Sequence, residues 1–250
     1  MSGANDVLAG WELGSFTAAG ITHATYRKGS GPGVVVVHEI PGITPLVAKF
    51  ADEVVDAGFT VMMPSLLGTP GKEPSGAYIA RSAMRLCVAR EFTKLALQQT
   101  SPIIAWLRAL ARNLHTEVGG PGVGAVGMCY SGGFALGMMV DDIMIAPVLS
   151  QPSLPAAIGS ARGADLGLSP DDAAAVAERA AQGCQVLGLR FSGDRLVGDR
   201  FESLRALLGD AFIAVELPSS TPSDHSVLTE QRDDASVRRV IEFFREKLIA

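Results

Sequence analysis

The chain has 250 residues, 48% of them hydrophobic, and a formal net charge of -5 at pH 7. A chain of this size can bury one large core, so we expect a single domain over residues 1–250. The dispersed, mildly acidic charge argues against nucleic acid as a partner, because binding to phosphates requires a basic surface. The N-terminus lacks the pattern of a signal peptide, and no apolar run is long enough to span a membrane. We therefore expect no membrane association, a cytoplasmic location, and a monomer or small homo-oligomer.

Cysteine usage points to free thiols. The sequence has 3 cysteines, Cys87, Cys129 and Cys184, which are too few for a disulfide scaffold and lack the paired spacing of a zinc site. It also contains no cluster of metal ligands and no glycine-rich phosphate loop in the proper context. We expect neither a metal nor an organic cofactor.

Strand and helix patterns alternate along the chain. Short apolar runs rich in β-branched residues predict buried strands at 33–40, 59–65, 123–129, 143–150, 185–192 and 211–218. Helical patterns cover 44–57, 79–113, 132–140, 199–208 and 233–248. This alternation predicts an α/β fold with a mostly parallel sheet covered by helices on both faces.

Two segments, 66–78 and 151–183, interrupt this regularity. In the second, Ser169 suits the N-cap of a helix, Pro170 its first position and Asp172 the capping-box position, and Gly183 ends the pattern. We predict a helical insertion around 153–183. It serves either as extra scaffold or as a lid or pocket wall, and the sequence leaves both roles open.

The segment with the clearest chemical meaning is VGAVGMCYSGG, residues 123–133, where a predicted strand ends and a helix begins within three residues. Such a sharp turn needs small residues two before and two after its central residue, and Gly127 and Ser131 flank Cys129 in that way. The turn would hold Cys129 at the carboxyl edge of the sheet and at the positive end of the next helix, where the thiolate is favoured. Two alternatives are that Ser131 is the nucleophile, flanked by Cys129 and Gly133, or that Cys129 is a buried structural residue.

A nucleophile on such a turn predicts an acid and then a histidine later in the chain. Asp194 follows the strand 185–192, and His225 lies in a polar loop before the last helix. Asp199 and Asp224 are substitutes for the acid. The remaining histidines fit less well, because they lie in an N-terminal strand region, inside a strand and near a helix end: His23, His38 and His115.

The loop after the strand 33–40 supplies a further part of the predicted site. In this architecture that loop contributes one backbone N–H of the oxyanion hole and the residue after the nucleophile contributes the other, so Ile40 and Tyr130 are the candidate donors. Glu39 ends an apolar strand, where an ionised and unpaired carboxylate would cost several kcal/mol. Glu39 therefore needs a partner.

Together these motifs resemble the dienelactone hydrolase family. The resemblance covers most of the chain and rests on Glu-Ile-x-Gly at residues 39–42, the cysteine turn at 127–133, the Ser-Gly-Asp turn at 192–194, and the His-Ser pair at 225–226.

This resemblance implies an α/β-hydrolase fold with a triad of Cys129, His225 and Asp194, acting on a cyclic enol ester or a similar small ester. It also implies that Glu39 holds or deprotonates the thiol, and that substrate binding moves Glu39 away so that the thiolate forms only when needed. Such gating would protect the sulfur from oxidation.

The chain departs from the family in one respect. Members use arginines to bind the substrate carboxylate, one of them four residues beyond the catalytic histidine, and here that position is Thr229. Arg81, Arg85 and Arg90 are candidate replacements, although helical arginines are most often solvated. A general carboxylesterase or thioesterase therefore competes with a dienelactone hydrolase, and a non-catalytic ligand-binding protein is a more distant alternative.

Overall fold

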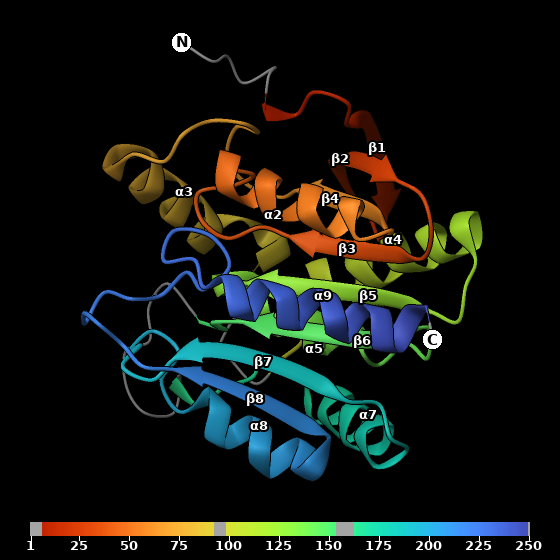
Figure 1. Ribbon diagram of the computed structural model, residues 1–250, viewed down its shortest axis with the longest axis vertical. Coiled ribbons are helices and arrows are strands. Elements are labelled where there is room, and N and C mark those ends of the chain that lie inside the picture. Colours follow the sequence, from red (N-terminus) through yellow and green to blue (C-terminus); the bar gives the residue numbers. More distant parts are fainter. Residues whose placement is uncertain (1–6, 93–98, 154–162, 250) are drawn as a thin grey trace.

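The computed structural model describes residues 7–92, 99–153 and 163–249 (Figure 1). Among these residues, eight strands form one sheet in the order β1-β2-β4-β3-β5-β6-β7-β8. The strands β3 to β8 pair in parallel, while β2 pairs antiparallel with both β1 and β4. The strand bounds are β1 Glu12–Ala18, β2 Ile21–Gly29, β3 Gly33–Val37, β4 Thr60–Ser65, β5 Val123–Met128, β6 Met144–Ser150, β7 Val186–Phe191 and β8 Phe212–Leu217. The predicted mostly parallel sheet is confirmed.

Helices cover both faces of the sheet, so the central strands are apolar on both sides. One face packs against α2 (Pro45–Asp56) and α9 (Asp234–Leu248), which lie in front of the sheet in Figure 1. The other face packs against α4 (Pro102–Val118), α5 (Gly132–Met138), α7 (Pro170–Ala181) and α8 (Arg200–Leu208). Successive valines of β3 belong to the two opposite cores, Val35 and Val37 to one and Val34 and Val36 to the other. This explains the unbroken valine run.

The predicted helix 79–113 is wrong as a single element. The chain instead forms α3 (Gly76–Val88), a 3-10 turn at Arg90–Phe92 and α4, which begins at Pro102, and residues 93–98 lie outside the described part. The reason is Pro102: a proline in the helix interior removes a hydrogen bond and clashes with the preceding turn, whereas at the first helical position it costs nothing.

One predicted strand end needs correction, and the sheet has an additional pair of strands. The strand predicted over 33–40 ends at Val37, because the next side chain, His38, turns to bind another loop: its Nε2 accepts the backbone N–H groups of Leu66 and Leu67 at 3.1 and 3.3 Å. The antiparallel pair β1–β2 precedes the first strand predicted with bounds, and it contains the N-terminal strand region in which the sequence places His23.

The predicted helical insertion is confirmed in its described part. Ser169 caps α7 by accepting the N–H of Asp172, and Pro170 is the first helical residue. Residues 154–162, within the predicted insertion, lie outside the description.

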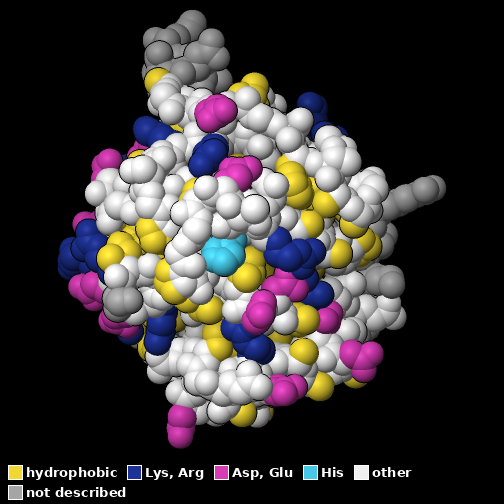
Figure 2. Space-filling view, turned by 90° about the vertical axis from the view of Figure 1, so that its right-hand side faces the viewer, with side chains coloured by type: hydrophobic (Ala, Val, Ile, Leu, Met, Phe, Trp, Pro, Cys, Tyr) yellow, Lys and Arg dark blue, Asp and Glu magenta, His cyan; other side chains and the backbone are white. Residues whose placement is uncertain are grey.

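The carboxyl ends of the parallel strands meet at one end of the sheet, on the left in Figure 1. Figure 2 shows the opposite end, where lysine and arginine side chains lie among aspartate and glutamate side chains. None of the described helices combines the length and apolar character that a bilayer crossing requires. The candidate site lies at the carboxyl end.

Candidate active site

The turn around Cys129 is sharp and sterically tight. β5 ends at Met128, and Cys129 then adopts a φ of 56°, a left-handed conformation that costs a non-glycine residue about 1–3 kcal/mol. A Cβ on Gly127 would lie 2.0 Å from the carbonyl oxygen of Ser131, and one on Gly132 would lie 2.6 Å from the Cα of Pro152. The predicted strand-turn-helix is confirmed, and packing imposes its small residues.

Ser131 has a structural role in this turn. Its side chain is fully buried, and its hydroxyl accepts the backbone N–H of Met128 at 2.9 Å. The same hydroxyl lies 3.1 Å from the carbonyl oxygens of Val37 and His38 and 2.9 Å from that of Met128, so it can donate to one of them at a time. Ser131 therefore ties β5 to the end of β3, and this arrangement argues against Ser131 as the nucleophile.

His225 and Asp194 form a pair across two loops. Nδ1 of His225 lies 2.6 Å from Oδ2 of Asp194, while Oδ1 of Asp194 accepts the backbone N–H of Leu196 at 2.9 Å. Both oxygens of the buried carboxylate are thus engaged. Nε2 of His225 is buried and has no partner in hydrogen-bonding geometry among the described residues. The ring is oriented by Asp194 and leaves its other nitrogen available.

The imidazole of His225 is tuned toward its charged form. Burial alone would lower its pKa, but Asp194 and Cys129, acting through side-chain interactions and charge, raise the pKa of His225 to about 10. Asp194 and the sulfur of Cys129 therefore both stabilise the imidazolium form of His225. The structure brings together the three residues that the sequence analysis predicted.

The sulfur of Cys129 has a further neighbour that the sequence analysis missed. Cys129 is partly buried, and the hydroxyl of Ser153 donates to its Sγ at 3.2 Å. Ser153 follows β6, the strand next to β5, so its position at the same sheet edge was the available signal. No motif marked it.

Glu39 is buried and is held by neutral donors. Its Oε2 accepts the hydroxyl of Ser226 at 2.8 Å and the side-chain amide of Gln151 at 3.2 Å, and its Oε1 accepts the hydroxyl of Thr229. Burial raises the pKa of Glu39, against the lowering effects of Thr229, Ser226 and the charge of His225. Among the described residues, no hydrogen bond joins Glu39 to the sulfur and no arginine pairs with it. The partner that Glu39 needed is this set of donors.

The two candidate oxyanion donors lie on either side of this region. Ile40 is in the turn after β3, and Tyr130 follows the sulfur-bearing residue in the 3-10 turn Cys129–Ser131. No hydrogen bond to the backbone N–H of either residue is found in the described part of the chain. Both therefore stay candidate donors.

The alternatives to the predicted acid and base have other roles. Asp224 accepts the backbone N–H groups of Ser220 and Thr221 at 2.6 and 2.9 Å and holds its own loop, while Asp199 is exposed at the start of α8. Burial lowers the pKa of His38 to about 4, so its ring is neutral and serves as a structural acceptor. The other two histidines lie on β2 and in the last turn of α4: His23 and His115.

Comparison with known proteins decides the family. Residues 20–150 match the model of the dienelactone hydrolase family, which is more than half of the chain. The chain belongs to the dienelactone hydrolase family. It is a hydrolase of the dienelactone hydrolase and esterase type, and this family implies a small-molecule substrate. The matched region includes Glu39 and Cys129 but ends before Asp194 and His225.

Solved structures share the α/β-hydrolase fold. A dienelactone hydrolase from Anabaena variabilis is 16% identical with a TM-score of 0.65, covering 95% of this chain and 98% of that one. A putative dienelactone hydrolase from Klebsiella pneumoniae is 17% identical with a TM-score of 0.61, at 95% and 98% coverage. A cold-adapted esterase from an Arctic intertidal metagenomic library is 16% identical with a TM-score of 0.62, at 95% and 93% coverage. No curated protein matches the chain in sequence.

In this member of the dienelactone hydrolase family, two of the arginines proposed from sequence, Arg81 and Arg85, are not among the residues that line the cavity next to Ser153. Both are exposed on α3, and the side chain of Arg90 lies outside the described part. Arg200, at the start of α8, was not predicted. It is 3% exposed and donates to the backbone carbonyl oxygens of Asp165, Leu196 and Val197, at distances from 2.8 to 3.1 Å.

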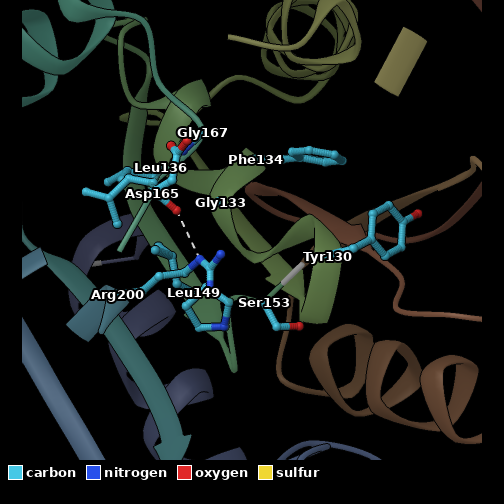
Figure 3. Close-up of a pocket in the computed structure, with 11 residues that line it drawn as sticks. Tyr130, Gly133, Phe134, Leu136, Leu149, Ser153, Asp165, Gly167 and Arg200 are labelled. Atoms are coloured by element: carbon cyan, nitrogen blue, oxygen red, sulfur yellow. Dashed lines mark hydrogen bonds between the residues drawn. The ribbon is translucent and has the colours of Figure 1, made fainter. Parts of the chain in front are cut away.

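A small cavity is lined by Ser153, the residue that donates to the sulfur of Cys129, and is shown in Figure 3. Arg200 reaches toward Asp165 on one side of it, and Ser153 and Tyr130 lie on the other. Asp165, Leu166 and Gly167 belong to the predicted insertion, so the insertion contributes a pocket wall. The hydroxyl of Tyr130 is buried without a partner among the described residues, and burial, with the charges of Cys129 and Glu91, raises its pKa well above the usual range.

Proposed function

We propose that this hydrolase cleaves a small ester or lactone, with Cys129 as nucleophile, His225 as general base and acid, and Asp194 as the group that orients His225. One observation carries the proposal. Asp194 holds Nδ1 of His225 and leaves its buried Nε2 without a partner among the described residues. Cys129, on its strained turn, raises the pKa of this histidine together with Asp194. An oriented base beside a thiol is the arrangement of nucleophilic catalysis.

The proposed reaction proceeds in two steps. His225 takes the proton of the thiol, the thiolate attacks the carbonyl carbon, and the C–O bond breaks as the leaving alcohol takes the proton from His225. Water, deprotonated by His225, then hydrolyses the thioester and restores the thiol. The backbone N–H groups of Ile40 and Tyr130, which are free of other bonds in the described chain, would stabilise the negative oxygen in both steps.

The substrate class depends on what binds a carboxylate. A dienelactone-like substrate carries one, yet Thr229 donates to Glu39, and Arg81 and Arg85 are exposed. The engagement of Thr229 with Glu39 and the exposure of the two arginines favour a second candidate, a general carboxylesterase or thioesterase that accepts neutral acyl groups. For Glu39 we propose that it tunes the site through the charge of His225, because gating by direct contact with the thiol would require its carboxylate to leave its three donors.

The decisive experiment compares wild type, Cys129→Ala and Cys184→Ala on a carboxylated dienelactone and on neutral nitrophenyl esters and thioesters. We expect Cys129→Ala to lose activity by several orders of magnitude while keeping its fold, because alanine fits the turn but has no nucleophile. Cys184→Ala, the control at the other described free cysteine, should keep full activity. A burst of nitrophenol in wild type would distinguish an enzyme from a binding protein. Full activity of Cys129→Ala would refute the proposed nucleophile.

A further inference from the structure

Ser153 contacts the reacting sulfur and has no assigned role. We propose that Ser153 is a further catalytic group, a hydroxyl donor that stabilises the thiolate of Cys129 before it attacks. This inference rests on the proposed function, because it gives Ser153 a role only if Cys129 is the nucleophile. The observation behind it is the hydrogen bond of 3.2 Å from the Ser153 hydroxyl to Sγ.

The backbone fixes Ser153 against the turn. Its N–H donates to the carbonyl oxygen of Cys129 at 3.0 Å, so one residue contacts the nucleophile through both its main chain and its side chain. Pro152 packs so closely that a Cβ on Gly132 would lie 2.6 Å from its Cα. Ser153 is also only 4% exposed. Its hydroxyl is therefore held at the sulfur, whereas the hydroxyl of an exposed serine would rotate into water.

A hydroxyl in this place favours one charge state of the sulfur. A hydrogen bond to an ionised acceptor is roughly twice as strong as one to a neutral acceptor, so Ser153 stabilises the thiolate more than the thiol. The imidazolium of His225 acts on the same sulfur, so the thiolate is stabilised from two sides. Once the sulfur has become part of a thioester, it carries no charge and the advantage is lost. The hydroxyl thus assists the step in which the thiolate forms.

Ser153 transfers no proton in this scheme. The proton of the thiol passes to His225 and then to the leaving alcohol, while the hydroxyl of Ser153 keeps its own. A stabilised thiolate is also somewhat less nucleophilic, with a Brønsted coefficient of about 0.4–0.5. The gain in thiolate concentration exceeds this loss wherever the sulfur is still mostly protonated.

Other titratable groups act on the same sulfur and must stay constant in a test. They are His225 before α9, Arg200 on α8 and Tyr130 in the turn itself. Removing one hydroxyl oxygen from Ser153 changes none of them. Ser153→Ala and Ser153→Gly both remove it, and Ser153→Thr keeps it.

The experiment measures the alkylation rate of Cys129 by iodoacetamide across pH, and the ultraviolet absorbance of the thiolate, in full-length protein with Cys87 and Cys184 replaced by serine. In Ser153→Ala and Ser153→Gly we expect the midpoint of both profiles to move up by about one pH unit. At a pH below the midpoint, this shift corresponds to a tenfold lower fraction of thiolate. Ser153→Thr should return the midpoint toward wild type. In ester hydrolysis, kcat should fall roughly 3- to 4-fold in Ser153→Ala with little change in KM, because the greater nucleophilicity of the less stabilised thiolate offsets part of the tenfold loss in thiolate fraction.

Ser203→Ala is the matched control, because the Ser203 hydroxyl donates to the carbonyl oxygen of Ala164 at 2.8 Å and contacts no sulfur. Its profile should match wild type. Unchanged midpoints in folded Ser153→Ala and Ser153→Gly would overturn the proposal, as would a Ser153→Thr profile equal to that of Ser153→Ala. The titration needs no substrate, so its failure is separate from loss of the proposed function, which Cys129→Ala alone decides.

Discussion

Ser131→Ala separates the two possible nucleophiles of the turn by stability and activity together. In the structure, the Ser131 hydroxyl holds the end of β5 against the end of β3, and the sulfur two residues earlier faces His225. If Cys129 is the nucleophile, alanine at 131 should produce a less stable enzyme that still works. If Ser131 is the nucleophile, the same variant should be inactive.

The expected loss of stability follows from the hydrogen bonds of this hydroxyl. Alanine removes the acceptor of the Met128 N–H and the donor to the carbonyl oxygens that surround it, at a side chain with 0% exposure. A buried polar group left without a partner costs about 1–3 kcal/mol, so we expect a loss of about 2–3 kcal/mol in the free energy of unfolding. For a chain of this size, that corresponds to a fall in Tm of roughly 4–12 °C.

The assay combines thermal unfolding with ester hydrolysis well below both melting temperatures. Ser236→Ala is the matched control, because Ser236 is also buried but its hydroxyl has no partner among the described residues. We expect Ser236→Ala to unfold close to wild type, and Ser131→Ala to unfold earlier with kcat within a few fold of wild type. A folded but inactive Ser131→Ala would refute the assignment of Cys129, and an unchanged Tm would refute the structural role of Ser131.

The sequence predicted the elements whose signals are local. The central strands are buried on both faces, so each appears as a short unbroken apolar run. The turn at Cys129 could be predicted because sterics allow only small residues at fixed positions around it, as the 2.0 Å approach at Gly127 shows. The order of acid and histidine along the chain then pointed to Asp194 and His225.

The elements that were missed carry weak or misleading local signals. β1 is a mostly exposed edge strand, with only two of its seven side chains partly buried, so it shows no apolar run. The break before α4 did have a signal, Ser101 followed by Pro102, but the helical periodicity on both sides of it suggested a single helix. Periodicity alone does not detect such an interruption.

The contacts that tune the site could not be predicted from sequence. Ser153, Arg200 and Thr229 lie in or beside loops, and each is placed by the packing of segments far apart in the chain. The bond from Thr229 to Glu39 joins residues 190 positions apart. In the sequence, Thr229 is marked only as the position where the family has an arginine, and its role as a donor to Glu39 depends on the three-dimensional fold.

Two further predictions concern ionisation. Asp194→Asn should lower the pKa of His225 from about 10, because the charge of Asp194 helps to raise it, and should reduce kcat roughly 10³- to 10⁴-fold. The stability that wild type gains from this histidine is fully present below about pH 6.5 and is lost as pH rises toward about 10. Measured by urea unfolding, the free energy of unfolding should therefore fall less across that pH range in Asp194→Asn than in wild type. An equal fall in both proteins would contradict the pairing of Asp194 with His225. For Glu39 the sign is the reverse of that of an ordinary paired carboxylate, because burial raises its pKa above 4.5. The folded protein then holds the proton of Glu39 more tightly than the unfolded chain does, so stability is lost as pH rises above 4.5 toward the raised pKa of Glu39. Glu39→Gln does not titrate, so its free energy of unfolding relative to wild type should increase as pH rises above 4.5. Glu73→Gln, at an exposed glutamate, is the control and should show no such trend. A constant difference between Glu39→Gln and wild type across this range would mean that the three donors fully compensate the burial of the carboxylate.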